Sequence, residues 1–205
     1  MRTPLGDADL TRIEDAVREA ERGTTAEIVV VIAAGPTPDR SALFWPALAA
    51  LTLPLPLLLL GRHLTASTLY AIELAILALG LALVLLPASR NRLTSATSRR
   101  TRARRVARDQ FFERGLHRTA ARTGVLLYVA PAERCAEIIA DAGAAGPLPD
   151  EAWHPCLDEL LAEARRDRLA DGIVGAVTRL GAVLREQAPA GRGDRNELPD
   201  RVVLL

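Results

Sequence analysis

Four carboxylates lie near the ends of the strands that the sequence predicts, or in the loop that follows them: Glu27, Asp141, Asp150 and Glu151. Converging carboxylates bind calcium and other divalent metals, and a metal held in this way can assist phosphoryl transfer. Two of the four also have plainer roles, since Asp150 is placed to cap a helix and Glu27 could simply mark the start of a strand. The set therefore allows a metal-dependent phosphatase site without establishing one.

The sequence contains none of the short motifs that identify common catalytic sites. It has no phosphate-binding glycine-rich motif, no HExxH and no nucleophile elbow. Cys135 and Cys156 match no metal-ligand spacing, which favours two small apolar side chains in a reducing compartment. One carboxylate, Glu73, interrupts an apolar run, where it could handle a proton or ion, or reach water and pair with Arg62. The catalytic residues are therefore unknown, and a non-enzymatic function is the leading interpretation.

Basic charge is concentrated in one block of the chain. All 26 basic residues are arginines, and eight of them follow the apolar region with no acid before Asp109. These eight are Arg90, Arg92, Arg99, Arg100, Arg102, Arg104, Arg105 and Arg108. Such a block can set membrane topology, bind anionic lipid or bind nucleic acid. Its position directly after an apolar run favours the first two, and aromatic residues, on which bases would stack, make up only 3% of the chain. We expect no nucleic-acid partner.

Two apolar runs precede the arginines, at residues 41–61 and 66–87, and they predict a transmembrane helical hairpin over residues 41–89. Each run is close to the ~20 residues that a helix needs to cross a bilayer. A buried hairpin of a soluble protein would keep a polar face, and a signal peptide would begin earlier in the chain. The turn between the runs carries only Arg62, so the positive-inside rule places both flanks in the cytoplasm. We expect a two-pass membrane protein with both termini cytoplasmic.

The rest of the chain predicts one α/β domain that the hairpin interrupts. Helices are expected at residues 7–22 and 95–122 and, as a pair, between 150 and 188. Strands are expected at residues 27–34, 124–130 and 135–140, the last two as a hairpin. Residues 1–40 offer no second strand, although backbone groups of a strand need hydrogen-bond partners. We therefore predict that residues 27–33 pair with residues 124–130. The tail, residues 189–205, could add an edge strand or dock on the domain.

Three segments resemble the TPM domain family: GTTAEIVVVIA, TGVLLYVAPAERCAEIIADAGAAGPLPDEAW and RLADGIVGAV. The resemblance covers residues 5–34 and 95–188, and the hairpin and tail look like those of a bacterial membrane subfamily. It implies a small mixed β-sheet sandwiched by helices, and domain parts at 1–40 and 90–188. Phosphatase activity and calcium binding have been proposed for some members. The Gly-x-Gly usual after the third strand is replaced by Asp141-Ala-Gly143, which puts a loop-borne activity in doubt.

Together these observations predict an integral protein of the bacterial inner membrane with a cytoplasmic TPM-like domain. Its expected role is a non-enzymatic interaction or assembly module that needs no cofactor. The alternative is a phosphatase of phosphomonoesters that uses calcium or another divalent metal. The expected partners are the lipid bilayer and another membrane or membrane-associated protein.

Overall fold

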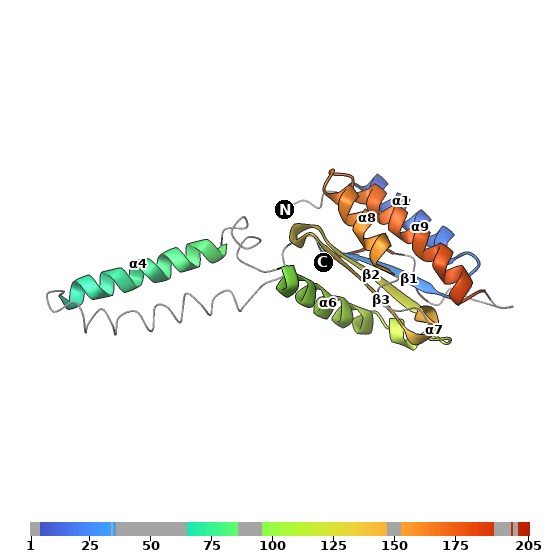
Figure 1. Cartoon of the computed structure of the whole chain (residues 1–205), viewed down its shortest axis with the longest axis horizontal. Helices are drawn as coiled ribbons and strands as arrows, with labels where there is room; N and C mark the ends of the chain where they lie inside the picture. Colours follow the sequence, from blue (N-terminus) through green and yellow to red (C-terminus); the bar gives the residue numbers. More distant parts are fainter. Residues whose placement is uncertain are drawn as a thin grey trace. The chain divides into compact units, whose positions relative to one another are not determined.

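Two stretches of the chain that are far apart in the sequence fold together. The computed structural model describes residues 5–33, 35, 65–85, 96–146, 153–190, 198 and 201–205. One compact unit contains Met1–Pro36 together with Thr97–Leu205, and a second contains Thr37–Ala96. Figure 1 shows the elements of the first unit, in which a small sheet lies between helices. This is a mixed α/β fold, as the sequence predicts.

The sheet has four strands in the order β3-β2-β1-β4. Strand β1 (Glu27–Ile32) is parallel to β2 (Gly124–Ala130), with Glu27 opposite Gly124, so the predicted pairing of these two segments is confirmed. Strand β3 (Cys135–Ala140) is antiparallel to β2, which confirms the predicted hairpin. The tail supplies a short edge strand, β4 (Val203–Leu204), parallel to β1. The sheet thus contains strands from both sides of the inserted segment.

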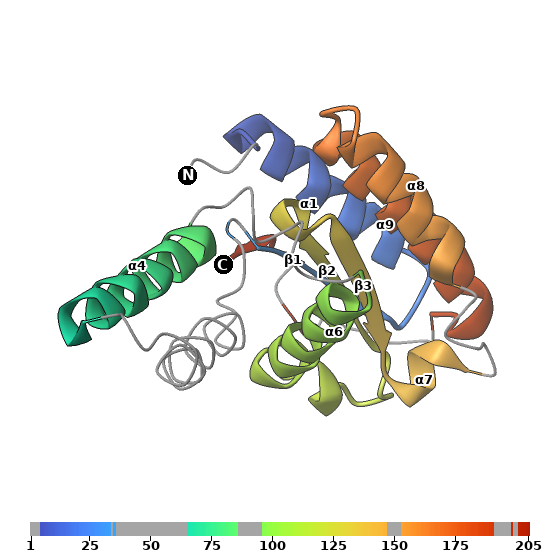
Figure 2. The same cartoon turned by 60° about the vertical axis from the view of Figure 1, so that its left-hand side comes forward.

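Helices cover both faces of the sheet, as the two views of Figures 1 and 2 show. Three helices pack on one face: α1 (Asp7–Glu21), α8 (His154–Ala164) and α9 (Leu169–Gln187). Helix α6 (Ala96–Glu113) packs on the other. Every residue of β1 is buried, and alternate side chains enter the two cores. Ile28 belongs to the core under α1 and α9, whereas Val29 belongs to the core under α6.

Helix α6 is shorter than the sequence predicts. The expected helix over residues 95–122 ends at Glu113, because Gly115 adopts a left-handed conformation (φ 74°) that an α-helix cannot continue. A 3₁₀ turn, η2 (Leu116–Arg118), follows and buries Leu116 completely. Leu116 lies four residues after Phe112, the spacing of one face of a helix, and for this reason the sequence predicted that the helix continues. In the structure the 3₁₀ turn buries this side chain instead. A second small correction concerns the loop expected after the third strand, where a four-residue helix, α7 (Ala142–Ala145), forms.

The second unit contains a twenty-residue helix, α4 (Ala66–Leu85). Tyr70, Leu74, Leu77 and Leu79 are exposed on it. Judged on the described side chains, which in α4 end at Leu79, no helix is long and apolar enough to cross a membrane. This part of the structure therefore gives no support to the predicted transmembrane hairpin. The first apolar run, residues 41–61, lies outside the described residues, so the hairpin stays a prediction.

Candidate functional site

A cavity of about 850 Å³ lies at the end of β2, where the strand runs into the 3₁₀ turn η3 (Pro131–Glu133). Seven of its lining residues are charged: Asp9, Arg12, Arg134, Arg165, Asp167, Arg168 and Asp171. The other seven are apolar: Leu5, Val129, Pro131, Leu161, Ala164, Leu169 and Ala170. Ligands of open α/β sheets commonly bind outside the carboxyl ends of parallel strands, which is where this cavity lies. We call it the arginine pocket.

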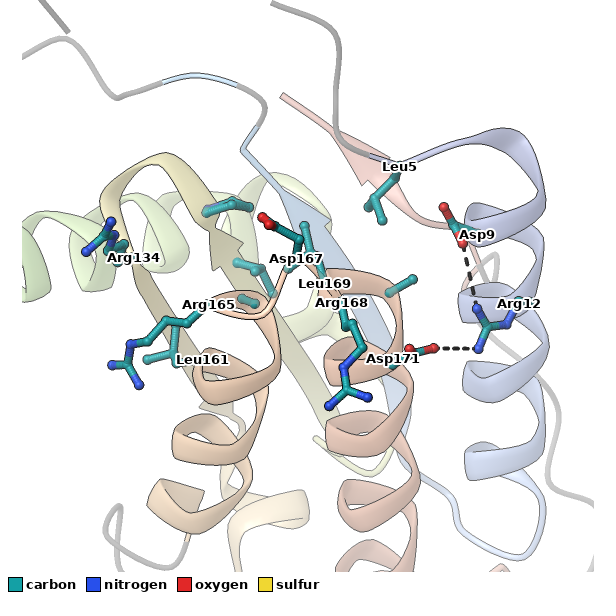
Figure 3. Close-up of a pocket in the computed structure, with 14 residues that line it drawn as sticks. Leu5, Asp9, Arg12, Arg134, Leu161, Arg165, Asp167, Arg168, Leu169 and Asp171 are labelled. Carbon is teal, nitrogen blue, oxygen red and sulfur yellow. Dashed lines mark hydrogen bonds and ion pairs between the residues drawn. The ribbon is translucent and has the colours of Figure 1, made fainter. Parts of the chain in front are cut away.

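On one side of the arginine pocket, an ion pair joins two helices (Figure 3). The Nη2 atom of Arg12, on α1, lies 2.7 Å from Oδ1 of Asp171, in the first turn of α9. The Nη1 atom of Arg12 is 3.7 Å from Oδ1 of Asp9. The hydrogen bond to Asp171 raises the pKa of the Arg12 guanidinium. Arg12 thus neutralises both aspartates on this side.

The opposite side carries Arg134 and Arg165, which Figure 3 shows apart from the Arg12 pair. Arg134 follows η3 in a left-handed conformation (φ 53°), and its backbone N–H donates to the Pro131 carbonyl at 3.1 Å. Arg165 follows the last turn of α8. Neither guanidinium has an ion pair within the described part of the chain, whereas Arg168 is paired with Glu163 at 2.6 Å. These two arginines are available to bind an anionic group.

The chemistry of this lining suits binding better than catalysis. It includes no Ser, Thr, Cys, His, Tyr or Lys, so among the described lining residues only the three aspartates could act as a nucleophile or base, and Arg12 pairs with two of them. Arginine stays charged and presents a planar set of donors that fits a carboxylate or phosphate. The pocket can therefore recognise an anion through arginine, with apolar side chains beside it.

Two of the carboxylates that the sequence singled out, Glu27 and Asp141, lie at the other end of β2. Glu27 begins β1, is only 7% exposed, and accepts a hydrogen bond from the Leu198 backbone N–H at 3.2 Å. Asp141 follows β3, and its own N–H donates to the Gly124 carbonyl at 2.9 Å. Strands β1 and β3 flank β2, so about 10 Å separates their backbones. The fold brings Glu27 and Asp141 to one edge of the sheet but keeps a strand between them.

Asp141 has a well-defined structural role at this edge. Its Oδ1 accepts from Nη2 of Arg122 at 2.8 Å and from the Ala142 backbone N–H at 2.7 Å, which makes it the N-cap of α7. The Arg122 hydrogen bond is the main reason that the pKa of Asp141 is lowered. Within the described ranges, no three His, Cys, Asp or Glu side chains are grouped to hold a metal. Asp150 and Glu151 lie outside the described residues, so the metal site stays a prediction.

The arginines of the basic block differ in their surroundings: Arg100 contacts other elements of the domain, whereas Arg105 and Arg108 are exposed. Arg100 donates to Glu137 of β3 at 3.3 Å and lies 2.9 Å from Nε2 of His154, so it links α6 to the sheet edge and to α8. Further along α6, Arg105 and Arg108 are exposed. Of the other arginines in this block, Arg90 and Arg92 lie outside the described residues, and Arg99, Arg102 and Arg104 are on α6. The carboxylate Glu73 belongs to α4.

Sequence reasoning missed the arginine pocket. Its charged residues come from α1, from the turn after β2, and from the connection between α8 and α9, so no local spacing groups them. The only signal in the sequence was the cluster from Arg165 to Asp171, which is typical of an ordinary polar connection. Tertiary contacts alone bring Arg12 to Asp171.

Comparison with known proteins supports the fold. A search of curated protein sequences gave no match. The solved structures include a similar one, the NMR structure of the BA42 protein from the psychrophilic bacterium Bizionia argentinensis. It is 18% identical, aligns over 98% of this chain and 95% of its own, and has a TM-score of 0.61. A sequence model described as the TPM domain matches residues 88–183, from just before α6 into α9. Residues 88–183 therefore carry a TPM domain, within a chain whose fold is similar to that of the BA42 protein.

Proposed function

We propose that this protein is a non-enzymatic, membrane-attached binding module. Its α/β domain lies in the cytoplasm, and a two-helix hairpin inserted between β1 and α6 crosses the bacterial inner membrane. The arginine pocket binds an acidic group of another membrane or membrane-associated protein. No cofactor takes part.

The membrane part of the proposal rests on the sequence of residues 41–89 and on the number of residues in α4. Twenty residues at about 1.5 Å per residue make a helix of about 30 Å, which is the thickness of a bilayer core. From Leu64 to Ser89 the sequence has a single charged residue, Glu73. The large apolar side chains described on α4 are exposed, as they would be toward lipid. The arginines that follow this helix in the sequence favour a cytoplasmic position for its second end, by the positive-inside rule.

One observation carries the choice of binding over catalysis. The described lining of the arginine pocket has arginines without ion pairs, while two of its three aspartates are neutralised by Arg12. Such a site can hold an anion through its arginines, and its described lining has no Ser, Thr, Cys, His, Tyr or Lys.

The proposal is tested with the full-length protein purified in detergent. Binding of a fluorescent hexaglutamate peptide is followed by anisotropy in the wild type and in the double variant Arg134→Gln/Arg165→Gln. Hydrogen bonds to charged groups contribute about 1.5–3 kcal/mol, so we expect Kd to rise about tenfold or more in the variant. Arg179→Gln is the matched control, because Arg179 pairs with Glu159 outside the pocket. Equal affinity in all three proteins would contradict the pocket as binding site.

The same preparation tests the rival function, a metal-dependent phosphatase. A generic phosphomonoester is supplied with calcium, magnesium or manganese and without metal. We expect no turnover above that of Asp141→Asn under any of these conditions. Metal-dependent turnover in the wild type that Asp141→Asn abolishes, with the fold retained, would overturn the non-enzymatic proposal.

A further inference from the structure

Helix α6 presents two different faces. Its buried side consists of Ala103, Ala107 and Phe111, which lie four residues apart and pack on the sheet. Arg105, Arg108 and Phe112 project from the other side of the same helix and are exposed. We call these three residues the outer face of α6. Among the described helices of this unit, α1, α8 and α9 cover the opposite side of the sheet.

Phe112 is an unusual residue for a surface. It is 60% exposed, and among described residues of the first unit only Leu204 and Leu205, at the end of the chain, are other exposed large apolar side chains. Its ring is held from two sides, by Phe111 at 5.8 Å and by the His117 ring at 5.2 Å between centroids. These two contacts position the ring and leave most of its surface exposed.

The charge beside Phe112 is mostly positive. Over residues 100–113 the arginines outnumber the acids by five to two. Arg105 and Arg108 form no ion pair within the described ranges, and of the two acids, Glu113 accepts a hydrogen bond from Gln110 at 2.5 Å. Asp109 is the remaining carboxylate and is exposed on the same helix. The outer face of α6 therefore offers two arginines without ion pairs and one exposed aromatic ring. Such a face complements a partner that has an anionic surface and an apolar layer below that surface.

We propose that the outer face of α6 lies on the anionic lipid surface of the membrane, with Arg105 and Arg108 at lipid phosphates and the Phe112 ring among the headgroups. This inference rests on the proposed membrane attachment. In the sequence only residues 86–95 separate α6 from α4, the helix that the proposed attachment places in the bilayer. Basic residues at the edge of a bilayer are attracted by anionic lipid, and an apolar side chain strengthens that contact. The hairpin and α6 then hold the domain at two points.

The test uses the full chain reconstituted in phosphatidylcholine vesicles with or without an equal amount of phosphatidylglycerol. A spin label is placed at position 112 (Phe112→Cys) in a protein with Cys135→Ala and Cys156→Ala, and its accessibility to oxygen and to a water-soluble nickel complex is measured. The matched control carries the label at Thr178, which is exposed on α9 across the sheet. We expect the label at 112 to enter the lipid in the anionic vesicles, while the label at 178 stays in water in both.

Arg105→Gln/Arg108→Gln should return the label at 112 to water, at the latest when salt is raised, because exposed charges act through a screened interaction. A label at 112 that stays in water in anionic vesicles, or that enters lipid equally without the two arginines, overturns the inference. Retention of the protein after an alkaline wash is measured on the same vesicles. Loss into the wash contradicts the membrane attachment itself, whereas retention with a water-exposed label contradicts only the role of α6.

Discussion

At the scale of single residues, Asp141 shows that a carboxylate with the position of a ligand can also have a structural role. Its place after a predicted strand and before a glycine-containing loop is typical of metal ligands in α/β proteins. In the structure, its carboxylate accepts hydrogen bonds from Arg122 and from the backbone N–H of Ala142 at the start of α7. Neither partner could be identified from the sequence, since Arg122 is 19 positions away and α7 is too short to show a helical pattern.

Two substitutions distinguish the stability that Asp141 contributes as a helix cap from the stability that its charge contributes. Asn caps helices as well as Asp, so Asp141→Asn removes only the charge, whereas Asp141→Ala removes both interactions. We expect Asp141→Ala to lower the free energy of unfolding by about 1–2 kcal/mol and Asp141→Asn to lower it less. Thermal unfolding followed by circular dichroism measures both. An equal loss in the two variants would show that the cap contributes nothing.

The same residue gives a pH dependence with a defined sign. Its pKa is lowered in the folded protein, so the charge of Asp141 stabilises the fold above the unfolded-state pKa of about 4, and this contribution is lost as the pH falls through the folded pKa. The advantage of the wild type over Asp141→Asn should therefore be full at pH 7 and vanish in acid. A constant difference across this range would contradict the ion pair with Arg122.

At the scale of elements, most of the fold could be predicted. Apolar periodicity located α1, α8 and α9, an unbroken β-branched run located β1, and a short apolar run after Gly124 located β2. The prediction of α6 was wrong past Glu113, because a turn that buries Leu116 has the same apolar spacing as a helix. The arginine pocket could not be predicted, because the packing of α1 against α9 brings its residues together.

Two glycines of α9 test that packing. A Cβ at Gly181 would lie 2.7 Å from the Cα of Ala20 on α1, whereas a Cβ at Gly175 would meet nothing within 4 Å. Gly181→Ala should therefore force α1 and α9 apart and cost about 1–3 kcal/mol. Gly175→Ala should instead stabilise the protein by about 0.5–1 kcal/mol, because alanine favours the helix. Chemical denaturation measures both, and similar effects at the two sites would contradict the close α1–α9 contact.

At the scale of the whole molecule, the chain is organised around an insertion. Strand β1 finds its neighbour β2 only beyond the apolar runs, and the β1–β2 pair forms the centre of the sheet. The sequence allowed this prediction because β1 has no other possible partner before the hairpin. The placement of residues 37–96 as a separate unit agrees with a domain that does not need them for its core. We therefore expect the domain to fold when they are absent.

The most direct test compares the full chain with a variant in which a short polar linker joins Gly35 to Ser95. Membranes from cells that express each protein are washed with alkaline carbonate, and the pellet and supernatant are assayed. We predict that the full chain stays in the pellet, while the linker variant is found in the supernatant with the circular dichroism of a folded α/β protein. Release of the full chain into the wash, or a linker variant that is unfolded, would contradict a self-contained domain held at the membrane by its insertion.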